Sequence, residues 1–155
     1  MSLTPAQELA ALKAQRTALA NARDARVAEA KVADQIAEQR RLLDLETALV
    51  DAEEKHGALG RKIAVVNFKH ADDSIAGSCI VKKPNHQIFR KFQLTDTKGE
   101  AARSNEIDAL FRHCLVWPSL DTFEALVEEH PGASAALLNT IGRLAGASAE
   151  EAAGK

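Results

Sequence analysis

The sequence is poor in aromatic residues and in cysteine. It contains no tyrosine, one tryptophan and five phenylalanines, and its two cysteines are Cys79 and Cys114. So few aromatic rings give no stacking platform for single-stranded nucleic acid, which argues against a nucleic-acid partner. Two cysteines cannot form a disulfide scaffold, and they indicate an intracellular protein with free thiols.

Long apolar runs are also missing. No segment approaches the roughly 18 consecutive apolar residues that cross a bilayer, and no basic-then-apolar signal peptide begins the chain. The 155 residues are nevertheless 46% apolar and 27% charged, which is enough to bury a core and argues against global disorder. We therefore expect a cytoplasmic protein with no membrane partner, built as one small domain plus an extended element.

The sequence lacks the familiar signatures of catalysis and of metal or cofactor binding. It has no phosphate-binding loop, no dinucleotide-binding glycine pattern, no zinc-protease motif and no pair of cysteines with two residues between them. His113 and Cys114 are adjacent, so on a helix they point about 100° apart and cannot form a metal-binding pair. We expect an exposed histidine beside a buried cysteine there. These absences predict a protein that is not an enzyme and holds no cofactor or metal.

A long helix is the main feature that is present, and it covers residues 4–56. Thr4 is a suitable N-cap, Pro5 suits the first helical position, and Gln7 completes a capping box. No proline or glycine follows until Gly57, which fits the position just after a helix. A helix from Pro5 to His56 has 52 residues and is about 78 Å long, far longer than a small domain is wide. We therefore expect this coiled-coil-like helix to project or to pair with another helix.

Apolar side chains on this helix form two rows at heptad-like spacing. The first row is Leu9, Leu12 and Leu19, and the second row is Val32, Ile36, Leu43 and Val50, joined by Leu42, Leu45 and Leu49. Between them the register breaks, or the seam is a close one packed through alanine. The rows predict pairing in a homo-oligomer or a hetero-complex, because isolated helices draw most of their stability from tertiary contacts. The alternative is a solvated single helix held by charge pairs such as Glu38 with Arg41.

The pattern changes after Gly57. Two short β-branched runs, residues 63–68 and 78–81, flank a turn-like segment at 70–74, which predicts a β-hairpin. A lone hairpin is marginally stable, so we expect it to lean on helices or to add to a partner's sheet. The apolar spacing beyond residue 84 predicts three or four further helices.

Together these segments predict an α+β protein that is mainly α-helical. Its expected organisation is a long N-terminal helix over residues 1–57, a compact domain of a hairpin and a small helix bundle over 58–146, and a frayed tail over 147–155.

A basic segment lies between two acidic ones. Residues 61–91 carry a net charge of +5, whereas residues 1–60 carry −2 and residues 92–155 carry −5. Four cations surround a predicted short helix: Lys82, Lys83, Arg90 and Lys91. They could dock an acidic partner or phosphate groups, or they could pair with acidic helices of the same chain at about 0–1 kcal/mol for each pair. We expect the phenylalanines of that helix, Phe89 and Phe92, to belong to the core.

The order of motifs over residues 63–146 is familiar as a whole. A strand with a basic pair and a proline precedes an aromatic and basic helix, in Ile80–Pro84 and Phe89–Phe92. The segments that follow are Asp108–Pro118, Phe123–Leu126, Glu129–Gly132 and Leu144–Gly146. This order resembles that of the small bacteriophage tail proteins described as tail assembly chaperones.

The resemblance implies a non-enzymatic protein of the bacterial host cytoplasm that acts during tail morphogenesis. Such proteins bind the tape-measure protein, the tail-tube subunit, or both, and keep them from assembling wrongly. They cover apolar or strand-edge surface until the correct partner displaces them.

The long helix lies outside the resemblance, so the function has alternatives. The helix could engage a helical tape-measure protein, or it could mark a structural tail or neck protein that oligomerises through it and stays in the virion. A bacterial coiled-coil adaptor is a third interpretation. The candidate partner-binding residues are Leu9, Leu12, Leu19, Val32, Ile36, Leu43, Val50, Lys82, Lys83, Arg90 and Lys91.

Overall fold

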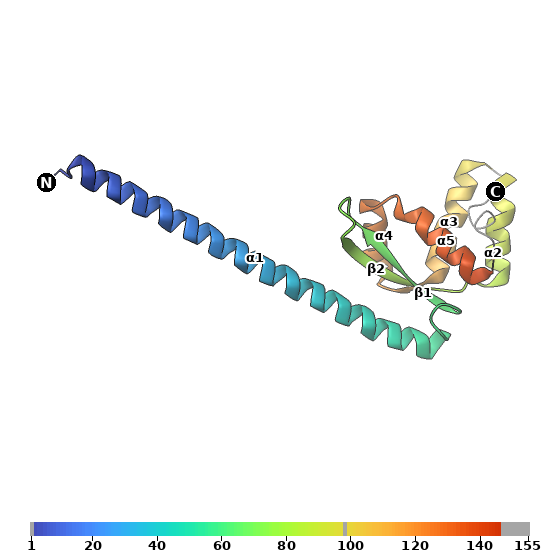
Figure 1. Ribbon diagram of the computed structural model, residues 1–155. Coiled ribbons are helices and arrows are strands. Elements are labelled where there is room, and N and C mark those ends of the chain that lie inside the picture. Colours follow the sequence, from blue (N-terminus) through green and yellow to red (C-terminus); the bar gives the residue numbers. More distant parts are fainter. Residues whose placement is uncertain (1, 98, 147–155) are drawn as a thin grey trace. The chain divides into compact units, whose positions relative to one another are not determined.

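The computed structural model describes residues 2–97 and 99–146. Over these residues the protein is mainly helical and contains a small antiparallel sheet, which confirms the predicted α+β fold class (Figure 1). The elements in chain order are α1 (Pro5–His56), β1 (Ile63–Lys69), β2 (Ile75–Lys82), α2 (His86–Gln93), the 3-10 helix η1 (Leu94–Thr97), α3 (Glu100–Cys114), β3 (Leu115–Trp117), α4 (Leu120–Glu129) and α5 (Ala133–Ala145). The frayed tail predicted for residues 147–155 lies outside the described residues.

Helix α1 is one uninterrupted helix of 52 residues, as predicted. Its first turn contains the expected capping box. The backbone N–H of Thr4 donates to Oε1 of Gln7 at 2.9 Å, and the N–H of Gln7 donates to the Thr4 hydroxyl at 3.4 Å. The helix ends at His56, and the next residue, Gly57, has a φ of +107°. Glycine adopts this left-handed conformation without the strain that a side chain would cause, so it stops the helix there.

The chain forms two compact units, and the division between them lies within α1. The first unit ends at Leu43 and the second begins at Asp44, whereas the sequence suggested a boundary after residue 57. The last turns of α1 belong to the second unit because they pack against its sheet, through Leu45, Ala48, Leu49 and Ala52. In the first unit, every described residue up to Arg40 is exposed.

The predicted hairpin is present in the second unit. Strands β1 and β2 are antiparallel, with Ile63 opposite Lys82 at one end and Lys69 opposite Ile75 at the other. The turn between them is closed by His70, whose N–H donates to the carbonyl of Ser74 at 2.8 Å. Both strands extend further toward the turn than the sequence indicated.

A third strand was not predicted. The sequence analysis predicted only helices beyond residue 84, but α3 ends at Cys114 and Leu115–Trp117 forms β3. Strand β3 pairs antiparallel with β2, with Trp117 opposite Ile80, so β2 is the central strand. The hairpin therefore extends its sheet with a strand of its own chain. Three residues that follow a helix directly are too few to show the alternation that marks a strand.

The sheet has two apolar faces, and each face has its own cover. Because side chains alternate along a strand, Phe68 and Cys79 point to one face and Ile63 and Ile80 to the other. The first face packs against α2, α3, α4 and α5, which lie beside the sheet in Figure 1. The second face packs against the end of α1. The phenylalanines of α2 are buried in the first cluster, which confirms their predicted place in the core.

We expect the core of the second unit to depend on Leu110. This side chain of α3 is 0% exposed, so Leu110→Ala should lower the free energy of unfolding by about 2–5 kcal/mol. The matched control is Leu59→Ala. Because Leu59 is 47% exposed, this change should lower the free energy of unfolding by less than about 1 kcal/mol. Urea unfolding monitored by circular dichroism measures both. Equal losses in the two variants would contradict this assignment of the core.

The two thiols should be unreactive in the folded protein. Burial raises the pKa of Cys79 to about 12, and burial also raises the pKa of Cys114 to about 12. Because the thiolate is the nucleophile, labelling at neutral pH should be roughly 1,000-fold slower in the native protein than in denaturant. The measurement is the rate of modification by a soluble disulfide reagent. Fast labelling of the native chain would show that the first face of the sheet is open.

Candidate interaction surfaces

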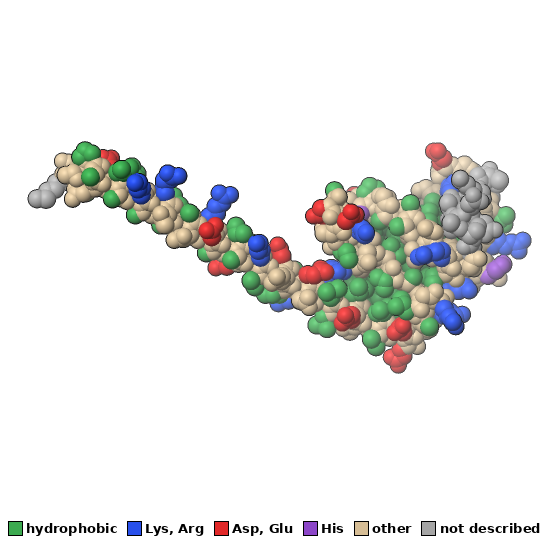
Figure 2. Space-filling view, in the orientation of Figure 1, with side chains coloured by type: hydrophobic (Ala, Val, Ile, Leu, Met, Phe, Trp, Pro, Cys, Tyr) green, Lys and Arg blue, Asp and Glu red, His purple; other side chains and the backbone are tan. Residues whose placement is uncertain are grey.

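The apolar side chains predicted to bind a partner are all exposed. Their exposed fractions run from 49% for Ile36 to 71% for Leu19. They are Leu9, Leu12, Leu19, Val32, Ile36, Leu43 and Val50. Figure 2 shows apolar side chains at intervals along α1, with charged side chains between them. Single exposed apolar residues are ordinary on a protein surface, but rows of large ones mark an interaction site.

The second row forms a shallow groove on α1. Val32, Ile36 and Leu43 line a hollow of about 310 Å³, and its polar rim comes from Gln35, Gln39 and Arg40. All six residues belong to the first compact unit. A helix surface of this kind can accept an apolar side chain of a neighbouring helix, as the holes of a coiled coil do.

Val50, the last residue of the second row, lies in the second unit on a face of α1 that the sheet contacts do not use. Leu45 and Leu49 cover the sheet, whereas Leu43 and Val50, in the same turns, are 62% and 64% exposed. Residues two positions apart in a helix are separated by a rotation of about 200°, so Leu43 and Leu45 point in nearly opposite directions. One face of these turns therefore packs against the sheet, and the other face is exposed to solvent.

The two rows do not lie on one face. Thirteen positions separate Leu19 from Val32 in a continuous helix, which corresponds to a rotation of about 220°. The register break suggested by the sequence is therefore a change of helix face, not an interruption of the helix. A single straight partner helix cannot cover both rows.

The predicted charge pair on α1 is present. Nη2 of Arg41 lies 2.7 Å from Oε1 of Glu38, and Arg41 Nε donates to the other carboxylate oxygen at 2.9 Å. The hydrogen bond from Arg41 lowers the pKa of Glu38. The pair lies at the surface, where such contacts add only tenths of a kcal/mol to helix stability.

The structure divides the predicted basic set. Lys91 pairs with Glu106 of α3, with 3.3 Å between Nζ and Oε1, which is the intrachain pairing that the sequence left open. Arg90 is exposed on α2. Lys82 and Lys83, by contrast, form no ion pair within the described residues and line a cavity of about 300 Å³.

The lining of this cavity, which we call the basic cavity, draws on residues that the sequence did not connect. It consists of His56, Lys62, Lys82, Lys83, Pro84, Asn85 and His113. Lys62 was missed because its place beside Lys83 depends on the strand register, which the sequence does not fix. The pairing of β1 with β2 is sufficient to make Lys62 and Lys83 neighbours.

His113 corrects one expectation. Cys114 is buried as predicted, but His113 is only partly exposed, and the backbone N–H of Asn85 donates to its Nε2 at 3.4 Å. Burial lowers the pKa of His113, and the positive charge of Lys82 lowers it further. Both effects favour the neutral imidazole.

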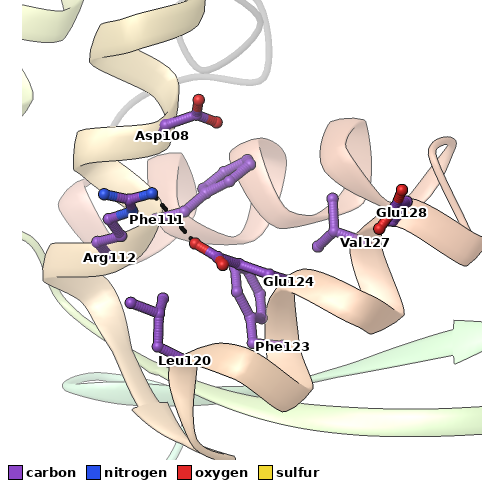
Figure 3. A pocket seen from close by; sticks show the side chains of 8 residues that line it. All are labelled: Asp108, Phe111, Arg112, Leu120, Phe123, Glu124, Val127 and Glu128. Atoms are coloured by element: carbon purple, nitrogen blue, oxygen red, sulfur yellow. Dashed lines mark hydrogen bonds and ion pairs between the residues drawn. The ribbon is translucent and has the colours of Figure 1, made fainter.

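A third hollow, of about 280 Å³, lies between α3 and α4 (Figure 3). Phe111, Leu120, Phe123 and Val127 form its apolar part, and Asp108, Arg112, Glu124 and Glu128 form the polar part. Arg112 and Glu124 form an ion pair across it at 3.1 Å, which Figure 3 marks. The sequence did not distinguish this hollow because its apolar residues have the spacing of ordinary core positions.

Within residues 2–97 and 99–146, no group of three or more histidine, cysteine, aspartate or glutamate side chains could hold a metal ion. In the same part of the chain no helix has the length and apolarity needed to cross a membrane. Comparisons with protein-family models, with curated proteins and with solved structures gave no match to this chain.

Proposed function

We propose that this protein is a non-enzymatic binding factor that pairs through α1 with a helical segment of another polypeptide chain. The observation that carries the proposal is the exposed row Val32, Ile36 and Leu43 on α1. Covering these side chains would stabilise the paired state by roughly 25 cal/mol for each Å² of apolar surface removed from water. The protein's own core gives this row no cover.

We propose tail assembly in a bacteriophage-infected bacterium as the setting. The support is the resemblance of residues 63–146 to tail assembly chaperones. The partner would be the tape-measure protein, the tail-tube subunit, or both, and the protein would act in the host cytoplasm while the tail is built. A helical tape-measure protein suits the apolar row, because helix-in-groove recognition uses anchors at this spacing.

The second candidate function is that of a structural tail or neck protein that oligomerises through α1 and stays in the virion. The length of α1 and its two rows on different faces support it, because two faces can bind two neighbours. The third candidate is a coiled-coil adaptor of the bacterium. Mass spectrometry of purified particles separates them: a structural protein is abundant there, and a chaperone is absent.

The pairing through the second row can be tested with Ile36→Asp combined with Leu43→Asp. Two carboxylates placed in an apolar seam lose hydration without gaining a partner, so the partner's affinity should fall at least ~100-fold. The measurements are the light-scattering mass of the purified chain and co-purification with co-expressed tape-measure and tail-tube proteins.

The matched control is Ala30→Asp combined with Ala37→Asp. It adds the same two charges at the same spacing on another, exposed face of α1, and it should leave the mass and co-purification unchanged. Wild-type association in the Ile36 and Leu43 variant, or an equal loss in both variants, would refute pairing through the second row.

A further inference from the structure

Five basic or titratable side chains converge on the basic cavity from separate segments of the second unit. His56 ends α1, Lys62 precedes β1, Lys82 ends β2 and Lys83 follows it, and His113 lies in the last turn of α3. No carboxylate lines the cavity, and Pro84 is its one apolar lining residue. Three lysines therefore line a cavity of about 300 Å³.

The backbone imposes this arrangement. Ile63 and Lys82 are opposite each other in the hairpin, and the N–H of Lys83 donates to the carbonyl of Lys62 at 2.7 Å. The stem of Lys62 lies against Gly57, where an added Cβ would come within 2.8 Å of its Cγ. Glycine at this position thus ends α1 and also leaves room for Lys62 at the cavity.

Folding alone does not account for this arrangement. Lys62 and Lys83 are neighbours across the end of the hairpin, and like charges opposite each other are destabilising. The lysines that line the cavity form no ion pair with a carboxylate in the described residues, whereas Lys91 nearby in sequence has Glu106. An anion bound among the three ammonium groups would convert this repulsion into attraction.

The cavity also borders the N-terminus of α2. Asn85 is the N-cap of this helix, and its side-chain oxygen accepts the N–H of Gln87 at 2.8 Å. Helix N-termini carry a partial positive charge and favour phosphate and carboxylate groups. This dipole adds to the lysines, so the positive potential in the cavity has two independent sources.

We infer that the basic cavity binds a compact polyanion of the diphosphate class, with Lys62, Lys82 and Lys83 as its principal ligands. Lysine binds phosphate oxygens as a point charge and needs no fixed geometry, which suits side chains from two segments. An acidic protein surface fits less well, because the centres of protein interfaces are apolar and aromatic, and this cavity is not. The inference is independent of what α1 binds.

The test is titration of the full chain with inorganic pyrophosphate by calorimetry, with ionic strength held constant. The variant Lys62→Gln combined with Lys83→Gln should bind at least ~10-fold more weakly, since two of three ligand charges are removed. The matched control, Arg90→Gln combined with Lys91→Gln, removes the same charge outside the cavity and should bind like the wild type. Circular dichroism and thiol protection show that each variant is folded.

Histidine resonances in the nuclear magnetic resonance spectrum give a second, site-specific readout. Pyrophosphate should shift the imidazole signals of His56 and His113, which line the cavity. It should not shift those of His70 and His130, which lie outside the cavity with their ring centroids 5.5 Å apart. A parallel titration with ADP identifies the source of the diphosphate: tighter binding than pyrophosphate indicates a nucleotide, and weaker binding indicates the free anion.

Three results would overturn the inference. They are the absence of heat and of histidine shifts with both ligands, an equal loss of affinity in the control variant, and binding of an acidic peptide or an oligonucleotide without binding of either diphosphate.

Discussion

The rest of the structure depends on the contact between the end of α1 and the second face of the sheet. A three-stranded sheet with apolar side chains on both faces needs two covers, and α2 to α5 supply only one. Leu45, Leu49 and Ala52 supply the other, packed on Ile63 and Ile80. The long helix is thus a part of the compact unit at one end.

This contact also fixes which side of the last turns of α1 is turned outward. Once Leu45 and Leu49 face the sheet, helical periodicity turns Val50 to solvent. The same helix end brings His56 to the lining of the basic cavity and places Gly57 against the stem of Lys62.

Local signals were sufficient to predict the long helix, the hairpin and the core role of Phe89 and Phe92. Capping residues, helix-breaking glycines and periodicity act over a few positions, and the sequence displays them directly. Strand β3 was missed because it is short and follows α3 without a turn signal. The partners of Lys82 in the basic cavity were missed because they depend on strand register and on the packing of helix ends.

The two rows on α1 were predicted residue by residue, but their relation was not. The sequence suggested a register break between Leu19 and Val32, and the uninterrupted helix makes it a rotation to another face. Binding at the two rows is therefore separable. A partner that covers the second row leaves Leu9, Leu12 and Leu19 for a different contact.

The central claim is that α1 up to Leu43 depends on a partner for its stability. Amide hydrogen exchange, followed by mass spectrometry, tests this claim most directly when the dilute chain is compared with the chain in complex. The account predicts that peptides from residues 5–43 exchange far faster than those of β1 and β2 in the dilute chain and become protected on pairing. Protection of residues 5–43 equal to that of the sheet in a dilute monomer would contradict it.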